Sequence, residues 1–271
     1  MSLTIAAGPL GERPSGRFRP DLEVPDALLY FEDNPRRIRA LFAEETIADS
    51  AGMKLLHERG RLPVYYFPRD DVRQDLLVRS DRSESSPTKG TATYWSVEVG
   101  DRKAPDAALS WSAELLSGFI ALEWDAMDEW FAEDEQLFGH ARDPYSRIDV
   151  HKSSRHIRVS RDGIVLADTR RARILFETAL PPRYYIPPED VRTELLVPSE
   201  TRTRCAYKGS APHWSVQIGE RLVEDLVWSY PAPEHDAEPI RDLLCFYGER
   251  VDIEIDSEAQ ERPLTQWSRE D

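Results

Sequence analysis

Alternating apolar and polar positions along the chain predict a protein built mainly from β-strands. In residues 251–256 (Val-Asp-Ile-Glu-Ile-Asp) and 95–99 (Trp-Ser-Val-Glu-Val) every second side chain is apolar, which is the period of a strand with one buried face. Residues 155–168 alternate on either side of Asp162-Gly163, a dipeptide typical of a two-residue hairpin turn.

Three segments depart from this alternation. Residues 238–247 and 115–124 place their apolar side chains at helical spacing, so we expect one short helix in each. Residues 1–34 are rich in Pro and Gly and predict an arm without regular structure.

Part of the chain is repeated. The run YYFPRDDVRQDLLVRSD at 65–81 reappears as YYIPPEDVRTELLVPSE at 184–200, an offset of 119 residues. Between residues 65–102 and 184–221, 18 of 38 aligned positions are identical, where unrelated sequences would give roughly two or three. We therefore interpret the chain as an internal duplication.

After this run the offset is expected to change. We align the Trp-Ser dipeptides at 111–112 and 228–229, and the strands that begin at 127 and 251. This alignment requires insertions and deletions in the loops beside the Trp-Ser strand, where they are best tolerated.

The predicted fold is mainly β, a β-rich α+β arrangement. It consists of two tandem copies of a small antiparallel sandwich or partly open barrel, each with one short helix. The predicted segments are an N-terminal arm at 1–34, a first repeat at 35–137, a linker at 138–153, a second repeat at 154–263 and a C-terminal tail at 264–271.

Composition narrows the classes of function. The net charge of -15 argues against non-specific nucleic acid binding, which needs clustered Lys and Arg. The sequence contains no run of eighteen apolar residues and no basic, apolar leader, so we expect a soluble, cytoplasmic protein that does not bind a membrane. Two cysteines form neither a disulfide framework nor a zinc site, and the histidines lack metal-ligand spacing, so we expect no metal.

The pattern Tyr-Tyr-x-Pro, Asp-Val-Arg and Leu-Leu is followed by Cys205-Ala-Tyr-Lys208-Gly209 and Trp214-Ser-Val. It resembles the domain-of-unknown-function family 427 in its tandem bacterial form, over nearly the whole chain after residue 30. Some catalogues give that family a nucleotidyltransferase-like label. The label implies a metal held by carboxylates, for which Asp71 and Asp190 are the candidates. The resemblance identifies no cofactor.

Lysine is rare here, yet two of the five lysines, Lys89 and Lys208, fall at equivalent positions before a glycine. Unlike arginine, a lysine can become a base or nucleophile when it is buried. The alternative is a hairpin turn with an exposed lysine and a glycine at positive φ.

The second copy has further candidates near its lysine. Cys205 lies three residues before Lys208, where its thiolate could meet the ammonium, and His213 lies five residues after it as a candidate base. The first copy has Ser86 and Tyr94 at these positions, so this chemistry is expected in the second copy alone. The alternative for Cys205 is a small buried apolar residue.

Both copies keep a tyrosine pair and an Asp-Val-Arg motif. Adjacent tyrosines in a strand face opposite sides, so one packs and the other lines a cleft beside the Asp and Arg. Alternatively, an internal Asp-Arg pair pins the loop, and the tryptophans that begin the strands are core anchors. The candidate binding residues are Tyr66, Asp71, Arg73 and Lys89, and Tyr185, Asp190, Arg192 and Trp214.

These residues favour a small-molecule-binding protein, with or without catalysis, whose pocket lies in the second repeat around Cys205, Lys208, His213 and Tyr185. A ligand pocket would bring these side chains together. The alternative is a non-catalytic protein-interaction or scaffolding module that holds a protein partner through its sheet faces and acidic surface. The third hypothesis is nucleotidyltransferase-like activity.

Overall fold

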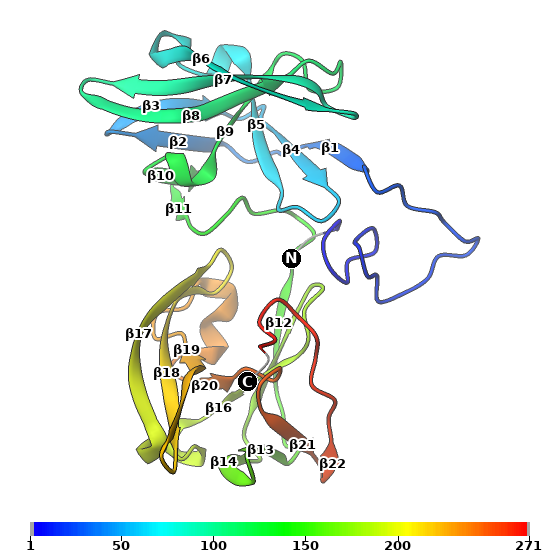
Figure 1. The fold of residues 1–271 in the computed structure, drawn as a ribbon, viewed down its shortest axis with the longest axis vertical. Coiled ribbons are helices and arrows are strands. Elements are labelled where there is room, and N and C mark those ends of the chain that lie inside the picture. Colours follow the sequence, from blue (N-terminus) through cyan, green and yellow to red (C-terminus); the bar gives the residue numbers. More distant parts are fainter. Residues whose placement is uncertain (1–2, 270–271) are drawn as a thin grey trace. The chain divides into compact units, whose positions relative to one another are not determined.

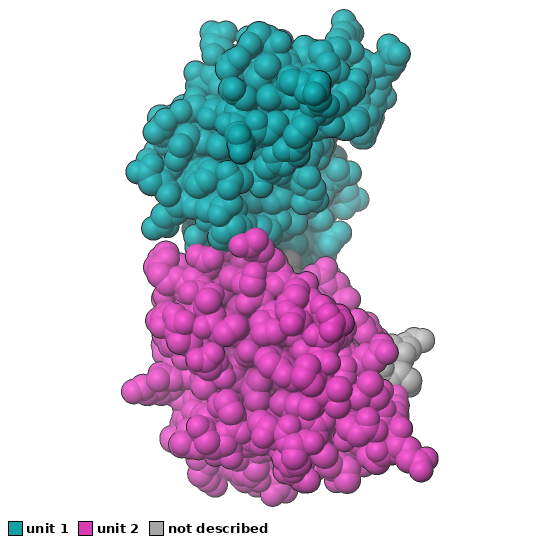
Figure 2. Space-filling view, turned by 90° about the vertical axis from the view of Figure 1, so that its left-hand side faces the viewer, with its two compact units in different colours: residues 1–145 teal, residues 146–271 magenta. Residues whose placement is uncertain are grey.

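The computed structural model describes residues 3–269, so the first two residues of the expected arm and the last two of the expected tail lie outside the described residues. The chain divides into two compact units, Met1–Tyr145 and Ser146–Asp271 (Figure 2). Within the described residues, each unit contains one antiparallel sheet of seven strands, the large sheet, and one of four strands, the small sheet (Figure 1).

In the first unit the large sheet has the strand order β1-β4-β5-β9-β8-β7-β6, and the small sheet has the order β11-β10-β2-β3. The strands are β1 (Leu29–Asp33), β2 (Ile38–Phe42), β3 (Glu45–Ser50), β4 (Lys54–Glu58), β5 (Val64–Pro68), β6 (Leu77–Ser86), β7 (Gly90–Val99), β8 (Arg102–Trp111), β9 (Phe119–Leu122), β10 (Glu129–Ala132) and β11 (Glu135–Leu137). Short 3₁₀ helices span Arg69–Asp71, Gln74–Leu76 and Trp124–Ala126.

The second unit has a large sheet of order β12-β15-β16-β20-β19-β18-β17 and a small sheet of order β14-β13-β21-β22. The strands are β12 (Ile148–Lys152), β13 (Ile157–Arg161), β14 (Ile164–Thr169), β15 (Arg173–Glu177), β16 (Arg183–Ile186), β17 (Leu196–Cys205), β18 (Gly209–Ile218), β19 (Arg221–Ser229), β20 (Leu244–Phe246), β21 (Asp252–Ile255) and β22 (Glu258–Ala259). Short 3₁₀ helices span Pro188–Asp190, Thr193–Leu195 and His235–Ile240.

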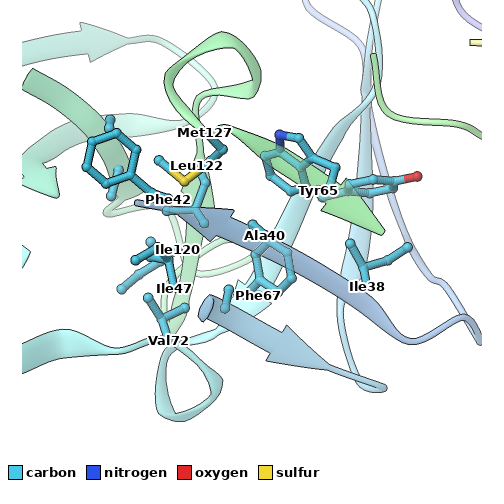
Figure 3. Close-up of a cluster of buried hydrophobic side chains, with 14 of the residues drawn as sticks. Ile38, Ala40, Phe42, Ile47, Tyr65, Phe67, Val72, Ile120, Leu122 and Met127 are labelled. Carbon is cyan, nitrogen blue, oxygen red and sulfur yellow. The ribbon is translucent and has the colours of Figure 1, made fainter. Parts of the chain in front are cut away.

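The core of the first unit lies between its two sheets (Figure 3). Strand β2 shows how the sequence builds it, because Ile38, Ala40 and Phe42 are buried while the residues between them are partly exposed. Burying each large apolar side chain stabilises the fold by about 1.5–3 kcal/mol. The predicted antiparallel sandwich is therefore confirmed, and the large sheet stays open rather than closing into a barrel.

The large sheet also buries side chains on its outer face, the face turned away from the small sheet. Tyr65 belongs to the inter-sheet core, whereas Tyr66 belongs to a second cluster that includes Tyr94, Leu109 and Trp111. The expectation that the adjacent tyrosines face opposite sides is confirmed. This outer face is where the candidate site lies.

The predicted hairpin around Asp162-Gly163 is confirmed, since β13 and β14 pair up to Arg161 and Ile164. The two predicted helices are wrong. Residues 238–247 form the end of a 3₁₀ helix and then β20, while residues 115–124 contain β9.

The apolar spacing misled because a run this short fits a buried strand as well as a helix. Pro239 and Ile240 instead end the 3₁₀ helix at His235–Ile240, before β20 begins at Leu244. Strand β20 pairs with both β16 and β19, and this pairing satisfies the hydrogen-bonding groups of its backbone.

The alignment of the two Trp-Ser dipeptides is also wrong. Tyr94 pairs with Leu109 in the first unit, and His213, its counterpart, pairs with Trp228 in the second. The offset of the earlier run therefore continues along this strand. Trp228 corresponds to Leu109, and Trp111 corresponds to Tyr230.

Regular structure extends into the expected arm and linker. β1 pairs with β4, and β12 with β15, each at an edge of its large sheet. Other described residues of the arm also make hydrogen bonds, including one from the Gly60 N–H to the Thr4 carbonyl.

Candidate functional site

The backbone at Lys89 forms the turn between β6 and β7. Gly90 has a φ of +77°, and a Cβ at this position would lie 2.4 Å from Ser112 Oγ, so glycine is required by conformation and by space. The turn is therefore present, as one interpretation of the sequence holds. The Lys89 side chain, however, is buried rather than exposed.

Each turn lysine forms an ion pair with a glutamate that the sequence did not single out. Lys89 Nζ lies 2.8 Å from Glu58 Oε2 and 4.6 Å above the Trp111 ring. In the second unit, Lys208 donates a hydrogen bond to Glu177. Glu58 and Glu177 are separated by the same offset as the lysines, so the repeat itself carried a signal for them.

Lys208 remains a cation in this environment. Burial alone would lower the pKa of Lys208, but Glu177 and Cys205 beside it raise the pKa above its usual value. A lysine that stays charged at neutral pH can hold an anion in place, but it is a poor base or nucleophile.

A cavity of about 390 Å³ in the first unit is lined by the outer face of the large sheet and also by Tyr65 and Trp130 of the inter-sheet core. This volume lies within the roughly 300–1,000 Å³ typical of small-molecule sites. The Lys89–Glu58 pair forms part of its wall. Its aromatic walls include Tyr66, Tyr94, Trp111, Trp124 and Trp130.

Tyr94, one of the aromatic residues that line the cavity, is held in place by its neighbours. Tyr94 donates a hydrogen bond of 2.9 Å to Glu84, and the guanidinium of Arg82 lies 4.1 Å from the centroid of the Tyr94 ring. Burial, together with the hydrogen bond to Glu84, raises the pKa of Tyr94 to about 12. The Tyr94 hydroxyl therefore stays protonated and occupied with Glu84.

Two carboxylates face the same cavity from the segment after β9. Glu123 and Asp125 both line it, and within residues 3–269 neither makes a hydrogen bond or close ion pair through its carboxylate. The surrounding protein raises the pKa of Glu123 above its usual range by burial, although Arg82 partly offsets this. Beside them, Trp124 stacks on Trp130 with ring centroids 4.7 Å apart.

The same face of the second unit is occupied by larger side chains. Trp228 stands where the first unit has Leu109, and its ring lies 4.4 Å from that of Tyr247. Because Ala121 and Cys245 each pair with the second tyrosine of their copy, Tyr247 corresponds to Glu123. The tryptophan and tyrosine thus take up space that is open in the first unit.

The candidates expected in the second copy are only partly brought together. Cys205 lies near Lys208 and helps to raise the pKa of that lysine, and the Tyr207 N–H lies 3.5 Å from Cys205 Sγ. His213 is instead next to Tyr247, 3.3 Å from its hydroxyl, and burial lowers the pKa of His213. Tyr185 is fully buried and accepts a hydrogen bond of 3.2 Å from Trp228.

Trp214 faces a separate shallow hollow of about 430 Å³ beside Leu196 and Pro212. Neither Cys205 nor Lys208 lines this hollow.

The Asp-Val-Arg motifs do not form the expected internal ion pair. Asp71 accepts a hydrogen bond of 2.5 Å from Ser50, while Arg73 pairs with Asp75. In the second unit, Asp190 binds Thr169 and Arg171, and Arg192 binds Glu194. These residues pin the loops that contain them, and they do not line the cavity.

Within the part of the chain that the structure describes, no three His, Cys, Asp or Glu side chains are grouped so that they could share a metal ion. Nor does any helix among the described residues have the length and apolar character needed to span a membrane.

Comparison with protein families gives a match along both units. A family model described as a domain of unknown function (DUF427) matches residues 30–133 and 149–257. No curated protein matches the chain.

Proposed function

We propose that this protein, which belongs to the DUF427 family through both of its units, binds a small molecule in the cavity of the first unit. The observation that carries the proposal is the difference between the units, since the cavity is open in one and its counterpart is occupied in the other.

The position of the proposed site differs from the one that the sequence favours. Sequence patterns place it in the second repeat, around Cys205 and Lys208. The first unit supports binding better, because its cavity combines aromatic walls with two carboxylates that form no close ion pair within the described residues, although the charge of Arg82 acts on Glu123. Such a mixture of apolar walls and a few polar groups is typical of ligand sites.

The proposal is for binding rather than catalysis. Lys89 is engaged by Glu58 and Trp111, and Tyr94 is engaged by Glu84. These groups can orient a ligand but are not arranged as a nucleophile beside a base.

The test is to fill the cavity as the second unit does. A small-fragment library would be screened by ligand-detected NMR against the wild-type chain and Leu109→Trp. We expect fragments that bind the wild type to lose binding to the variant. Leu222→Trp, which places the same side chain at an exposed position of the second unit, is the matched control. If no fragment binds, or if all bind Leu109→Trp equally well, the proposal fails.

A second candidate is thiol chemistry in the second unit, because Cys205 lies near the Lys208 ammonium and helps to raise the pKa of that lysine. The thiolate is the reactive form of a cysteine. The test is the rate at which iodoacetamide modifies Cys205 at pH 7 in the wild type and in Lys208→Met. A clear fall in the variant supports activation by the lysine, and an unchanged rate removes this candidate. Buried Cys245, whose pKa is raised by burial to about 12, serves as the unreactive reference.

A further inference from the structure

The second unit holds a buried guanidinium on the outer face of its large sheet. Arg183 makes two hydrogen bonds of 2.7 Å to Glu249, and the exposed fractions of the two side chains are only 8% and 0%. The guanidinium lies 5.6 Å from the Trp228 ring and 5.4 Å from the Trp267 ring. This is a complete binding arrangement for a planar cation, made of a two-pronged carboxylate and aromatic faces.

The first unit has a carboxylate at the equivalent position, exposed rather than buried, but not the cation. Arg183 pairs with Leu175 in its sheet, and Val64 pairs with Leu56, the counterpart of Leu175. Val64 therefore stands where the second unit has its arginine.

The carboxylate can be matched in the same way. Asp125 follows Ala121 by the same number of residues as Glu249 follows Cys245, and Ala121 and Cys245 occupy equivalent positions in their sheets. Asp125 thus corresponds to Glu249. Val64 and Asp125 both line the cavity.

Building on the proposed function, we infer that the ligand of the first unit carries a planar cation, a guanidinium or an amidinium. This group would lie against Asp125 and Glu123, with Trp124 as its aromatic neighbour. The ligand would thereby supply the group that Arg183 supplies from within the second unit.

Within the described residues, no cation forms a close ion pair with either carboxylate, although the charge of Arg82 acts on Glu123. Lys89 Nζ is 2.8 Å from Glu58. Arg82 lies over Tyr94, with Glu84 and Asp106 as its nearest carboxylates at 4.0 and 3.8 Å. A carboxylate ligand would instead face Glu123 and Asp125 with like charge, which is unfavourable.

Three probes of nearly the same shape separate charge from shape. Benzamidine is cationic, benzamide is its neutral analogue and benzoate is anionic. We expect calorimetric titration of the full chain to give affinities in the order benzamidine, benzamide, benzoate. Because hydrogen bonds to charged groups are strong, benzamidine should bind at least about tenfold more tightly than benzamide.

Substitution then identifies the carboxylate. Asp125→Asn keeps the size of the side chain and should weaken benzamidine about tenfold while leaving benzamide unchanged. Asp101→Asn, at an exposed aspartate of the same unit, removes the same charge away from the cavity and should change neither affinity.

The outcomes separate this inference from the proposed function. If benzamide binds as tightly as benzamidine, or if Asp125→Asn weakens both equally, the cationic ligand is ruled out while small-molecule binding stands. If fragments bind the cavity but benzamidine does not, the cationic ligand is likewise ruled out. If no fragment and none of the three probes binds, both proposals fail.

Discussion

The two units have the same sheet topology and the same buried lysine–glutamate pair, but they differ on the outer face of the large sheet. In the second unit this face is completed by Trp228, Tyr247 and Arg183. In the first unit the corresponding residues are Leu109, Glu123 and Val64, and a cavity lies there. These three differences lie on the face that is open in the first unit and packed in the second.

This difference shows which shared residues belong to the scaffold. Lys89 and Lys208 hold equivalent glutamates whether or not a cavity is present, so recurrence in both copies marks support of the turn rather than chemistry. The residues that distinguish the units are those that differ between the copies. A search for residues shared by the two copies therefore does not identify the cavity.

The largest effect on stability is expected at the buried guanidinium. Arg183→Val makes the second unit resemble the first and leaves Glu249 buried without its cation. Removing one partner of a buried pair costs about 3–5 kcal/mol. The free energy of unfolding of the full chain in urea measures this loss.

The double variant Arg183→Met with Glu249→Leu is the control, because it removes both charges and keeps apolar volume. We expect it to be much less destabilised. A double variant as unstable as Arg183→Val would show that packing, not the unpaired charge, causes the loss.

A smaller effect is expected at the turn lysines, with an asymmetry between the units. Lys208→Met leaves the Glu177 carboxylate, whose side chain is 6% exposed, without this ammonium, and should cost about 3 kcal/mol. Lys89→Met should cost about 1 kcal/mol, since the Glu58 side chain is 22% exposed and water can solvate it. Chemical denaturation of the two variants compares them directly, and equal losses would contradict this explanation.

The smallest effect is the pH dependence of benzamidine binding. The pKa of Glu123 is raised by burial, with Arg82 lowering it and Asp125 and Glu84 raising it further. Glu123 is therefore charged above this raised pKa and neutral below it. Affinity should be highest above that pKa and fall severalfold as the pH drops through it.

Titration of the wild type and of Glu123→Gln at pH 7 and pH 5 measures this effect. The variant should lose part of the pH dependence while remaining weaker than the wild type at pH 7. Identical pH profiles for the two proteins would exclude a role for Glu123.

Much of the fold could be predicted from the sequence, because duplication and strand periodicity depend on local patterns. The hairpin at Asp162 and the opposite-facing tyrosines were found in this way. The strand β20 was not, because tertiary pairing with β16 and β19 decides between helix and strand in a short apolar run.

The site was harder to predict. Its cavity depends on Leu109 lying where the other copy has Trp228, and only the strand register shows that these residues correspond. Glu58 could have been found from its equivalence to Glu177. Asp125 could not have been found from the sequence. It stands out only because its counterpart in the second unit, Glu249, binds Arg183, and the first unit has no arginine at the position of Arg183.

The most direct test of the difference between the units is the response of the tryptophan indole N–H signals to benzamidine in ¹⁵N–¹H NMR spectra of the full chain. The seven tryptophans include Trp111, Trp124 and Trp130 around the cavity, and Trp228 and Trp267 on the packed face of the second unit. We predict that the signals of the cavity tryptophans shift while those of Trp228 and Trp267 stay in place. Shifts at Trp228 and Trp267 instead would contradict this account and place the site in the second unit, where the sequence alone predicts it.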